Sequence, residues 1–233
     1  MEKAGPAPHP QSSLRYRPYA FVKFNLITSR SGRWACPRCF LRINFRMARK
    51  WSNLNLPGAL HFVTGNFLDR IPIFTEPACC NAFLEQLSSL NQKWPSKLIA
   101  YVLMPDHFHL ISNPRDGRIK EFVGALKSLS AKSIVRVDKQ FRFHASAVGH
   151  QVWQESFKAL PLWSAWMIWQ KINYIHANPV KAGIAKSAKD YCWSSFRSFY
   201  SQSDQSLAVD HDWWWSDDAE KLSLAVKQMG WHR

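Results

Sequence analysis

Two histidines stand one residue apart in a largely apolar stretch, "YVLMPDHFHLIS" at residues 101–112. Side chains two residues apart on a strand point to the same side, so His107 and His109 project together while Phe108 points to the opposite face. Two charged imidazoles would repel each other at that separation, so a neutral pair suits a divalent metal ion. The alternative is two histidines that hydrogen-bond separately, because this spacing alone does not define a metal site.

A second polar pattern lies in "QKINYIHANPVKAG", residues 170–183. Gln170, Tyr174 and Asn178 recur every four residues, so on a helix they form one polar stripe. Tyr174 and Asn178, one turn apart, can then face a sheet together. The structural alternative is a core tyrosine with a satisfied hydroxyl, followed by an asparagine that caps the helix before Pro179.

The rest of the pattern predicts the elements that position these residues. Apolar spacing and turn residues predict strands at 59–67, 98–104, 107–112 and 152–157, and helices at 75–94, 118–137 and 162–178. Thr75 caps the first helix, the turn at Pro105–Asp106 closes a hairpin, and Pro179 ends the third helix. This order predicts an α+β, ferredoxin-like β-α-β-β-α-β antiparallel sheet with helices on one face. A further C-terminal helix carries Tyr174, and a short helix is expected after Ser216.

Length and composition favour one globular domain with a basic extension. The 233 residues are 46% hydrophobic, which is enough for a sizeable core. Residues 1–46 contain nine basic residues and one acidic residue, so they hold +8 of the net charge of +15. We expect residues 1–46 to be a disordered basic extension, 47–200 to be the folded domain, and 201–233 to be a C-terminal tail. Met47 is an alternative start of the native protein.

The charge also bears on partners. A strongly basic chain favours a polyanion such as nucleic acid, the alternative being charge that serves only solubility. No uninterrupted run of 18 apolar residues and no apolar signal core occur, which argues against a membrane span and against export. Five cysteines without a disulfide framework fit a reduced, cytoplasmic protein. Cys36 and Cys39 have zinc-knuckle spacing but lack a second pair.

Four stretches, taken together, resemble a known family. "MPDHFHLI", "VWQESF", "NYIHANPVKAGI" and "YCWSSFRSF" occur in the order and spacing of the REP-associated tyrosine transposases, in the IS200/IS605-like superfamily of single-tyrosine (Y1) HUH transposases. The resemblance covers about residues 58–200. It implies a ferredoxin-like nuclease domain at 47–200 that acts on single-stranded DNA folded into a stem-loop. It also implies that His107, His109 and Asn178 bind the metal ion and that Tyr174 is the nucleophile.

These residue types suit the implied chemistry. A tyrosine hydroxyl has a pKa near 10 in water and is a weak nucleophile at neutral pH, so it needs assistance. Two imidazoles and an amide oxygen hold a divalent cation and leave positions open for phosphate oxygens. Mg²⁺ or Mn²⁺ fits this role, and the presence of two imidazole ligands favours Mn²⁺. Zinc would bind more rigidly. Attack by Tyr174 would leave a 5′-phosphotyrosine and a free 3′-hydroxyl that can reverse the step.

Contacts with DNA are expected from basic residues that lie off the apolar face of the second helix: Lys120, Lys127, Lys132 and Arg136. Binding should therefore weaken steeply as salt rises from about 50 to 200 mM. The chain departs from the family pattern after "VWQ", where Lys158 and Ala159 stand roughly at the position of an acidic residue and a histidine. A role for that pair is not carried over to this chain.

Two other candidates for metal binding are more readily explained as structural residues. His61 on the first strand would approach a metal ion only if it faces the same side as the histidine pair. The aspartates in "DHDWWW" at residues 210–215 are of a type that commonly caps turns and helices.

Three functions from different classes are compatible with these residues. The first is a metal-dependent nickase and strand-transferase for single-stranded DNA, the second a catalytically silent hairpin-binding protein, and the third a metallohydrolase that uses water. The four residues His107, His109, Tyr174 and Asn178 favour the first, because a binding protein has no need for all of them. The expected partner is single-stranded or hairpin DNA, with no membrane and no organic cofactor. We expect a monomer or homodimer in the cytoplasm, associated with the nucleoid.

Overall fold

The computed structural model describes residues 53, 55–138, 151–200 and 207–228, all within the compact unit formed by residues 44–233. The expected extension at 1–46, with Cys36 and Cys39, lies outside the described residues. The strands are β1 (Leu60–Asn66), β2 (Ser96–Met104), β3 (His107–Pro114) and β4 (Lys158–Leu162). The helices are α1 (Pro77–Lys93), α2 (Ile119–Val137), α4 (Ala165–Lys181), α5 (Phe196–Tyr200) and α6 (Asp218–Gln228), with 3-10 turns at Leu68–Arg70, Ile73–Thr75 and Ala188–Asp190. None of the described helices is long and apolar enough to span a membrane.

The four strands form one antiparallel sheet in the order β2-β3-β1-β4. β3 inserts between β1 and β2, which is the arrangement of the ferredoxin-like split βαβ unit, so the predicted fold class is confirmed. Pro105 and Asp106 form the turn between β2 and β3, where Met104 pairs with His107. This short turn fixes the register that places the histidine pair at the start of β3.

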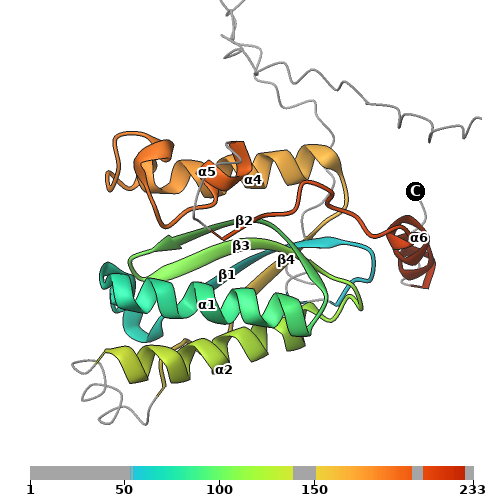
Figure 1. The fold of residues 1–233 in the computed structure, drawn as a ribbon. Coiled ribbons are helices and arrows are strands. Elements are labelled where there is room, and N and C mark those ends of the chain that lie inside the picture. The colour runs from blue at the N-terminus through green and yellow to red at the C-terminus, as the bar shows by residue number, and fades with distance from the viewer. Residues whose placement is uncertain (1–52, 54, 139–150, 201–206, 229–233) are drawn as a thin grey trace, which may run out of the picture. The chain divides into compact units, whose positions relative to one another are not determined.

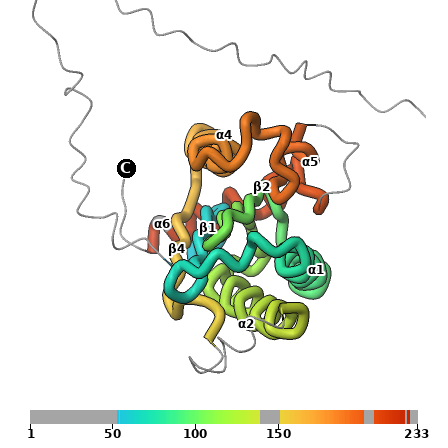
Figure 2. Tube along the Cα trace, turned by 90° about the vertical axis from the view of Figure 1, so that its left-hand side faces the viewer, coloured from blue at the N-terminus to red at the C-terminus, as the bar shows by residue number. Residues whose placement is uncertain are grey.

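Helices cover both faces of the sheet (Figure 1). On one face, α1 and α2 pack over a core that includes Phe108 of β3. On the other face, α4 packs through residues such as Ile172 over a second core that includes Ile111 of β3. Figure 2, turned by 90°, shows the sheet between the two helical layers. Because side chains alternate along β3, His107 and His109 face α4, on the same side as Ile111.

The prediction of a fourth strand at 152–157 is wrong, since the strand that joins the sheet is β4, directly after that segment. Residues 152–157 contribute only one bridge, from Trp153 to Phe67, and these two rings stack with centroids 4.1 Å apart. The apolar side chains of this segment therefore fill the core, and its backbone does not form the hydrogen-bond ladder of a strand. β4 contains Pro161. A proline within a segment lowers the expectation that the segment is a strand, but it is tolerated in a strand at the edge of a sheet, where β4 lies.

α4 continues through Pro179 to Lys181, so the prediction that Pro179 ends this helix is wrong. A proline in the last turn removes only one backbone hydrogen bond, and the helix ends at Lys181, two residues before Gly183, whose φ is +71°. Tyr174 and Asn178 consequently lie in the same regular helix, one turn apart.

Two helix starts differ in their caps. The Ser164 hydroxyl accepts a hydrogen bond from the Met167 amide at 3.3 Å and caps α4. Thr75 does not cap α1 as predicted, because its hydroxyl donates to the Pro72 carbonyl at 2.7 Å. α1 begins instead at Pro77, whose missing N–H needs no partner in the first turn.

The chain after α4 returns to the open edge of β2. The Leu103 amide donates to the Trp193 carbonyl at 2.8 Å, and the Leu98 amide donates to the Asp210 carboxylate at 2.7 Å. These bonds satisfy backbone groups that an edge strand would otherwise expose. The aspartates of residues 210–215 therefore have structural partners, and the short helix expected after Ser216 is α6.

Candidate active site

His107 and His109 lie at the start of β3, on the face covered by α4. Their ring centroids are 4.8 Å apart, with the rings at 80° to each other. His109 is buried, whereas 16% of the His107 side chain is exposed. The pair thus projects together from the strand, with one imidazole inside the protein and one open to solvent.

Hydrogen bonds orient both imidazoles. His109 Nδ1 lies 2.8 Å from Thr64 Oγ1, and His107 Nδ1 lies 2.5 Å from Asp106 Oδ1. With an Nδ1–H donated to each of these oxygens, the Nε2 lone pair is the one left for a ligand. His109 Nε2 is buried and has no hydrogen-bond partner in the described part of the chain. An orphaned buried nitrogen is costly, so these residues fit a divalent cation bound at Nε2.

Arg70 lies beside this pair and shares the Asp106 carboxylate. Its Nε is 2.7 Å from Asp106 Oδ2, while Nη1 donates to Asn66 Oδ1 at 2.5 Å. Arg70 and Asp69 have φ values of 57° and 51°, in the left-handed region that non-glycine residues rarely adopt. This unusual turn places a guanidinium where it holds Asp106 against His107.

Burial is the main reason why the pKa of His109 is lowered to about 3. The proximity of three other basic groups, His107, Lys171 and Arg70, lowers it further. His109 is therefore neutral at physiological pH, which is the state that an imidazole needs to bind a metal ion.

A second buried imidazole gives a testable dependence of stability on pH. Burial lowers the pKa of His176 on α4 to about 4, and its Nε2 lies 3.0 Å from Ser195 Oγ. Both histidines start from 6.5, so the unfolded chain takes up protons that the folded chain does not. The stability gained from neutral His109 and His176 is complete above pH 6.5 and is lost as pH falls toward 4 and then 3.

We expect each histidine to add up to about 1.4 kcal/mol per pH unit to the slope of the unfolding free energy in this window. Urea unfolding at half-unit steps of pH measures that slope. His176→Gln should lower it by the share of one proton. An unchanged slope in His176→Gln contradicts this account.

Tyr174 reaches the histidine pair from α4. Its ring centroid lies 5.4 Å from that of His109 and 5.8 Å from that of Phe62, which itself stacks on His109 at 5.3 Å. Its side of the site is open, since 38% of Tyr174 is exposed. The structure therefore brings together the phenol and the two imidazoles that the sequence singled out.

Asn178 follows Tyr174 by one turn. α4 runs antiparallel to β3 (Figure 1), so Asn178 is displaced from Tyr174 toward the start of β3, where His107 lies. Its Nδ2 is buried and has no hydrogen-bond partner in the part of the chain that the structure describes. A flip of the amide exchanges oxygen and nitrogen, so an oxygen can occupy this open position. The side chain is thus available as a ligand, and its role as the third ligand stays a prediction.

A family model described as "Transposase IS200 like" matches residues 59–178, a range that contains His107, His109, Tyr174 and Asn178. The chain belongs to the IS200-like transposase family. The family resemblance predicted from the four sequence stretches is confirmed.

Other proteins resemble this IS200-like transposase over much of its length. A Haemophilus influenzae protein that carries the name REP-associated tyrosine transposase is 25% identical over 142 residues, which cover 60% of this chain and 80% of that one. A solved structure of a REP-associated tyrosine transposase bound to a REP hairpin is 20% identical, with a TM-score of 0.49, over 68% of this chain and 92% of that chain. A Deinococcus radiodurans R1 structure described as a transposase is 22% identical, with a TM-score of 0.38, over 50% of this chain and 87% of that chain.

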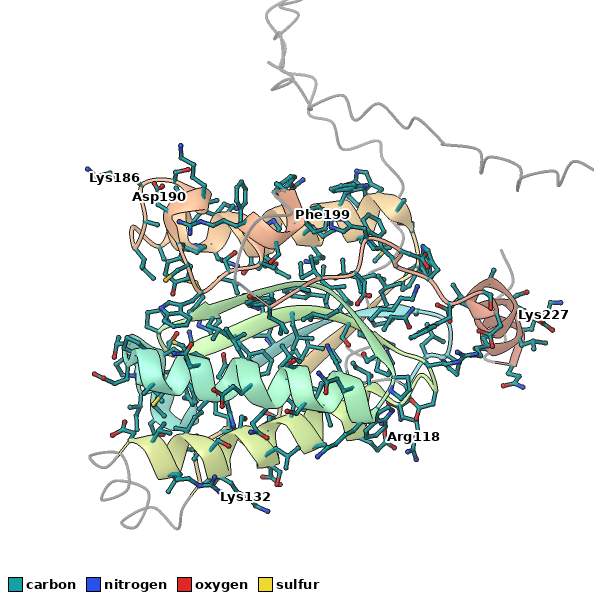
Figure 3. All side chains as sticks on the ribbon, viewed as in Figure 1. Arg118, Lys132, Lys186, Asp190, Phe199 and Lys227 are labelled. Carbon is teal, nitrogen blue, oxygen red and sulfur yellow. The ribbon has the colours of Figure 1, made fainter. Side chains whose placement is uncertain are left out.

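The basic residues predicted to contact DNA lie away from the histidines. They belong to α2, on the opposite face of the sheet: Lys120, Lys127, Lys132 and Arg136. Figure 3 shows Lys132 on the outer side of this helix. Lys127 Nζ donates to the carbonyls of Gln154 at 2.6 Å and Glu155 at 2.9 Å, so its ammonium group is already engaged. The role of these four residues in DNA binding stays a prediction. A DNA strand that contacts both these residues and Tyr174 must pass around the edge of the β-sheet.

Other candidates from the sequence fall outside the site or beside it. His61 alternates with Phe62 along β1 and so points to the face opposite His109. Lys158, where the chain departs from the family pattern, pairs with Thr64 and lies on the His109 face. In the described ranges, no group of three or more His, Cys, Asp and Glu residues could hold a metal ion. A site built from two histidines and an asparagine is of a different composition.

Six residues of the site were not singled out by the sequence: Phe62, Thr64, Asp106, Arg70, Lys171 and Lys181. Asp106 directly precedes His107, so its place in the sequence was a usable signal. The two lysines stand three residues before and seven residues after Tyr174, so helical spacing was a usable signal for both of them. Thr64 and Arg70 reach the site only through the pairing of β1 with β3 and through an unusual turn.

Proposed function

We propose that this transposase is a metal-dependent endonuclease and strand-transferase for single-stranded DNA, with Tyr174 as its nucleophile. The observation that carries the proposal is the approach of Tyr174 to the histidine pair, with 5.4 Å between the ring centroids of Tyr174 and His109. A phenol in this position can attack a phosphate group that is held beside the Nε2 atoms of His107 and His109.

His107, His109 and Asn178 would hold the cation, which we propose is Mg²⁺ or Mn²⁺. Oxygen ligands suit both ions, and two imidazoles favour Mn²⁺. When bound, the cation polarises the scissile phosphate and offsets the charge that develops in the pentacovalent transition state. Thr64 and Asp106 hold the imidazoles in the tautomer and orientation that this requires.

In the cleavage step, the Tyr174 oxygen forms a bond to phosphorus while the bond from phosphorus to the 3′-oxygen breaks. The phenol gives its proton to solvent and the departing 3′-oxygen takes up a proton, so the products are a 5′-phosphotyrosine and a 3′-hydroxyl. Because the phosphodiester is conserved, attack by a second 3′-hydroxyl reverses the step, frees Tyr174 and joins the strands.

The substrate that we propose is single-stranded DNA beside a hairpin. Membership of a transposase family supports a DNA substrate, and the name of the Haemophilus influenzae relative supports a REP-like hairpin. An unpaired strand also suits the open side of Tyr174, because the phosphate must approach the exposed phenol without a second strand around it.

Covalent capture tests the proposal against the two alternatives. Purified protein is incubated with hairpin-bearing single-stranded DNA and Mn²⁺, then denatured and separated by electrophoresis. A DNA–protein adduct that maps to Tyr174 supports the transferase. Binding without cleavage indicates the silent hairpin-binding protein, and cleavage without an adduct indicates a hydrolase that uses water.

A further inference from the structure

Two lysines of α4 flank Tyr174. Lys171 Nζ lies 5.5 Å from the centroid of the Tyr174 ring and 4.9 Å from that of Phe62. Lys181 Nζ lies 5.6 Å from the Tyr174 ring centroid. The helix places them one turn before and two turns after the tyrosine, so both lean toward the same side as the phenol.

Neither lysine is neutralised by an acidic side chain in the described ranges, because no ion pair there includes Lys171 or Lys181. The carboxylate of Asp106, next to the histidines, is already shared between Arg70 and His107. The side of the site around Tyr174 therefore carries unpaired positive charge.

Packing on aromatic rings accounts for only part of this arrangement. A cation over the face of Phe62 or Tyr174 is favourable, and one lysine alone could serve to hold α4 on the sheet. Two ammonium groups that approach the same ring repel each other, however, and this repulsion is relieved when an anion lies between them. In a transposase, the anion that must come to Tyr174 is a phosphodiester.

We propose that Lys171 and Lys181 bind the non-bridging oxygens of the phosphodiester that Tyr174 attacks. This inference deepens the proposed function and rests on it. The two ammonium groups hold the phosphate in line with the phenol from the helix side, while the histidine pair lies on the sheet side. Their charge also opposes the increase in negative charge as the new phosphorus–oxygen bond forms.

A scan with neutral linkages tests this assignment without depending on cleavage. In the Tyr174→Phe protein, binding is measured for a set of hairpin-bearing oligonucleotides in which one phosphodiester at a time is replaced by a methylphosphonate. We expect one linkage whose neutralisation weakens binding by about tenfold, the usual loss for a charged contact. Adding Lys171→Gln or Lys181→Gln should remove most of that difference, whereas Lys171→Arg should retain it.

Lys227→Gln is the matched control, because Lys227 is an exposed lysine on α6 (Figure 3). It should leave the neutral-linkage effect unchanged. If the same linkage keeps its effect in both glutamine variants, the lysines do not contact it and the assignment is overturned; the same holds if no linkage shows an effect. Failure of the proposed function is seen separately, as the absence of a Tyr174 adduct in the wild-type protein.

Discussion

Tyr174→Phe is expected to abolish the covalent DNA–protein adduct and to lower strand cleavage by at least about 10⁴-fold, the scale on which loss of a nucleophile acts. The change removes one oxygen atom and keeps the ring. Contacts of that ring with His109 and Phe62 should therefore persist. The measurement is the rate of adduct formation on hairpin-bearing single-stranded DNA with saturating Mn²⁺.

Two comparisons make the Tyr174 result specific. Hairpin affinity of Tyr174→Phe should stay within about threefold of wild type, because the phenol oxygen acts only in the chemical step. Tyr200→Phe removes the hydroxyl of another exposed tyrosine, on α5, and should form the adduct at the wild-type rate. If the adduct still forms in Tyr174→Phe but does not form in Tyr200→Phe, the nucleophile lies on α5, and its assignment to Tyr174 on α4 is wrong.

His109→Ala is expected to weaken Mn²⁺ binding by more than about 100-fold and to lower cleavage at fixed Mn²⁺ accordingly. The reason is that removal of a ligand should exceed the 10–100-fold losses seen when an outer-shell partner is removed. Thr64→Val, which removes the hydroxyl bound to His109 Nδ1, should fall in that smaller range. Calorimetric titration with Mn²⁺ measures the affinity directly, without DNA.

The order of the two effects is the informative part of the His109 experiment. His211→Ala serves as the control, since His211 is an exposed histidine far along the chain from β3. Equal Mn²⁺ affinity in wild type and His109→Ala, with the fold retained by circular dichroism, would show that the cation does not bind this ring. A larger loss in Thr64→Val than in His109→Ala would show that the hydroxyl, and not the imidazole, is the ligand.

Local geometry explains why much of the fold could be predicted. The hairpin around Pro105 and Asp106 and the helices around it depend on short-range preferences that a sequence displays directly. β4 was misplaced because its Pro161 is tolerated only at a sheet edge, and edges are decided by strand order. Pro179 was misread because a proline in the last turn of α4 costs too little to end a helix that is packed on a core.

Some residues of the candidate site could be predicted from the sequence and others could not. Its phenol and imidazoles were found from spacing along one helix and one strand, and Asp106 was adjacent to one of them. Thr64 was not found, because only the pairing of β1 with β3 brings its hydroxyl to His109. The basic residues of α2 were expected to contact DNA because of their charge, and only the structure shows that they lie on the face of the sheet opposite the histidines. A single sequence shows which residues share an element and does not show which face of the sheet that element covers.

The sequence by itself determined that His107 and His109 point the same way and that Tyr174 and Asn178 share a helical stripe. Both follow from the repeat distances of strand and helix. Only the tertiary structure decided that α4 lies on the histidine face and that Thr64 and Asp106 orient the imidazoles. It also decided that two lysines without acidic partners in the described ranges flank the phenol. Those contacts join residues far apart in the chain, and they exist because the two apolar faces of the sheet must both be buried.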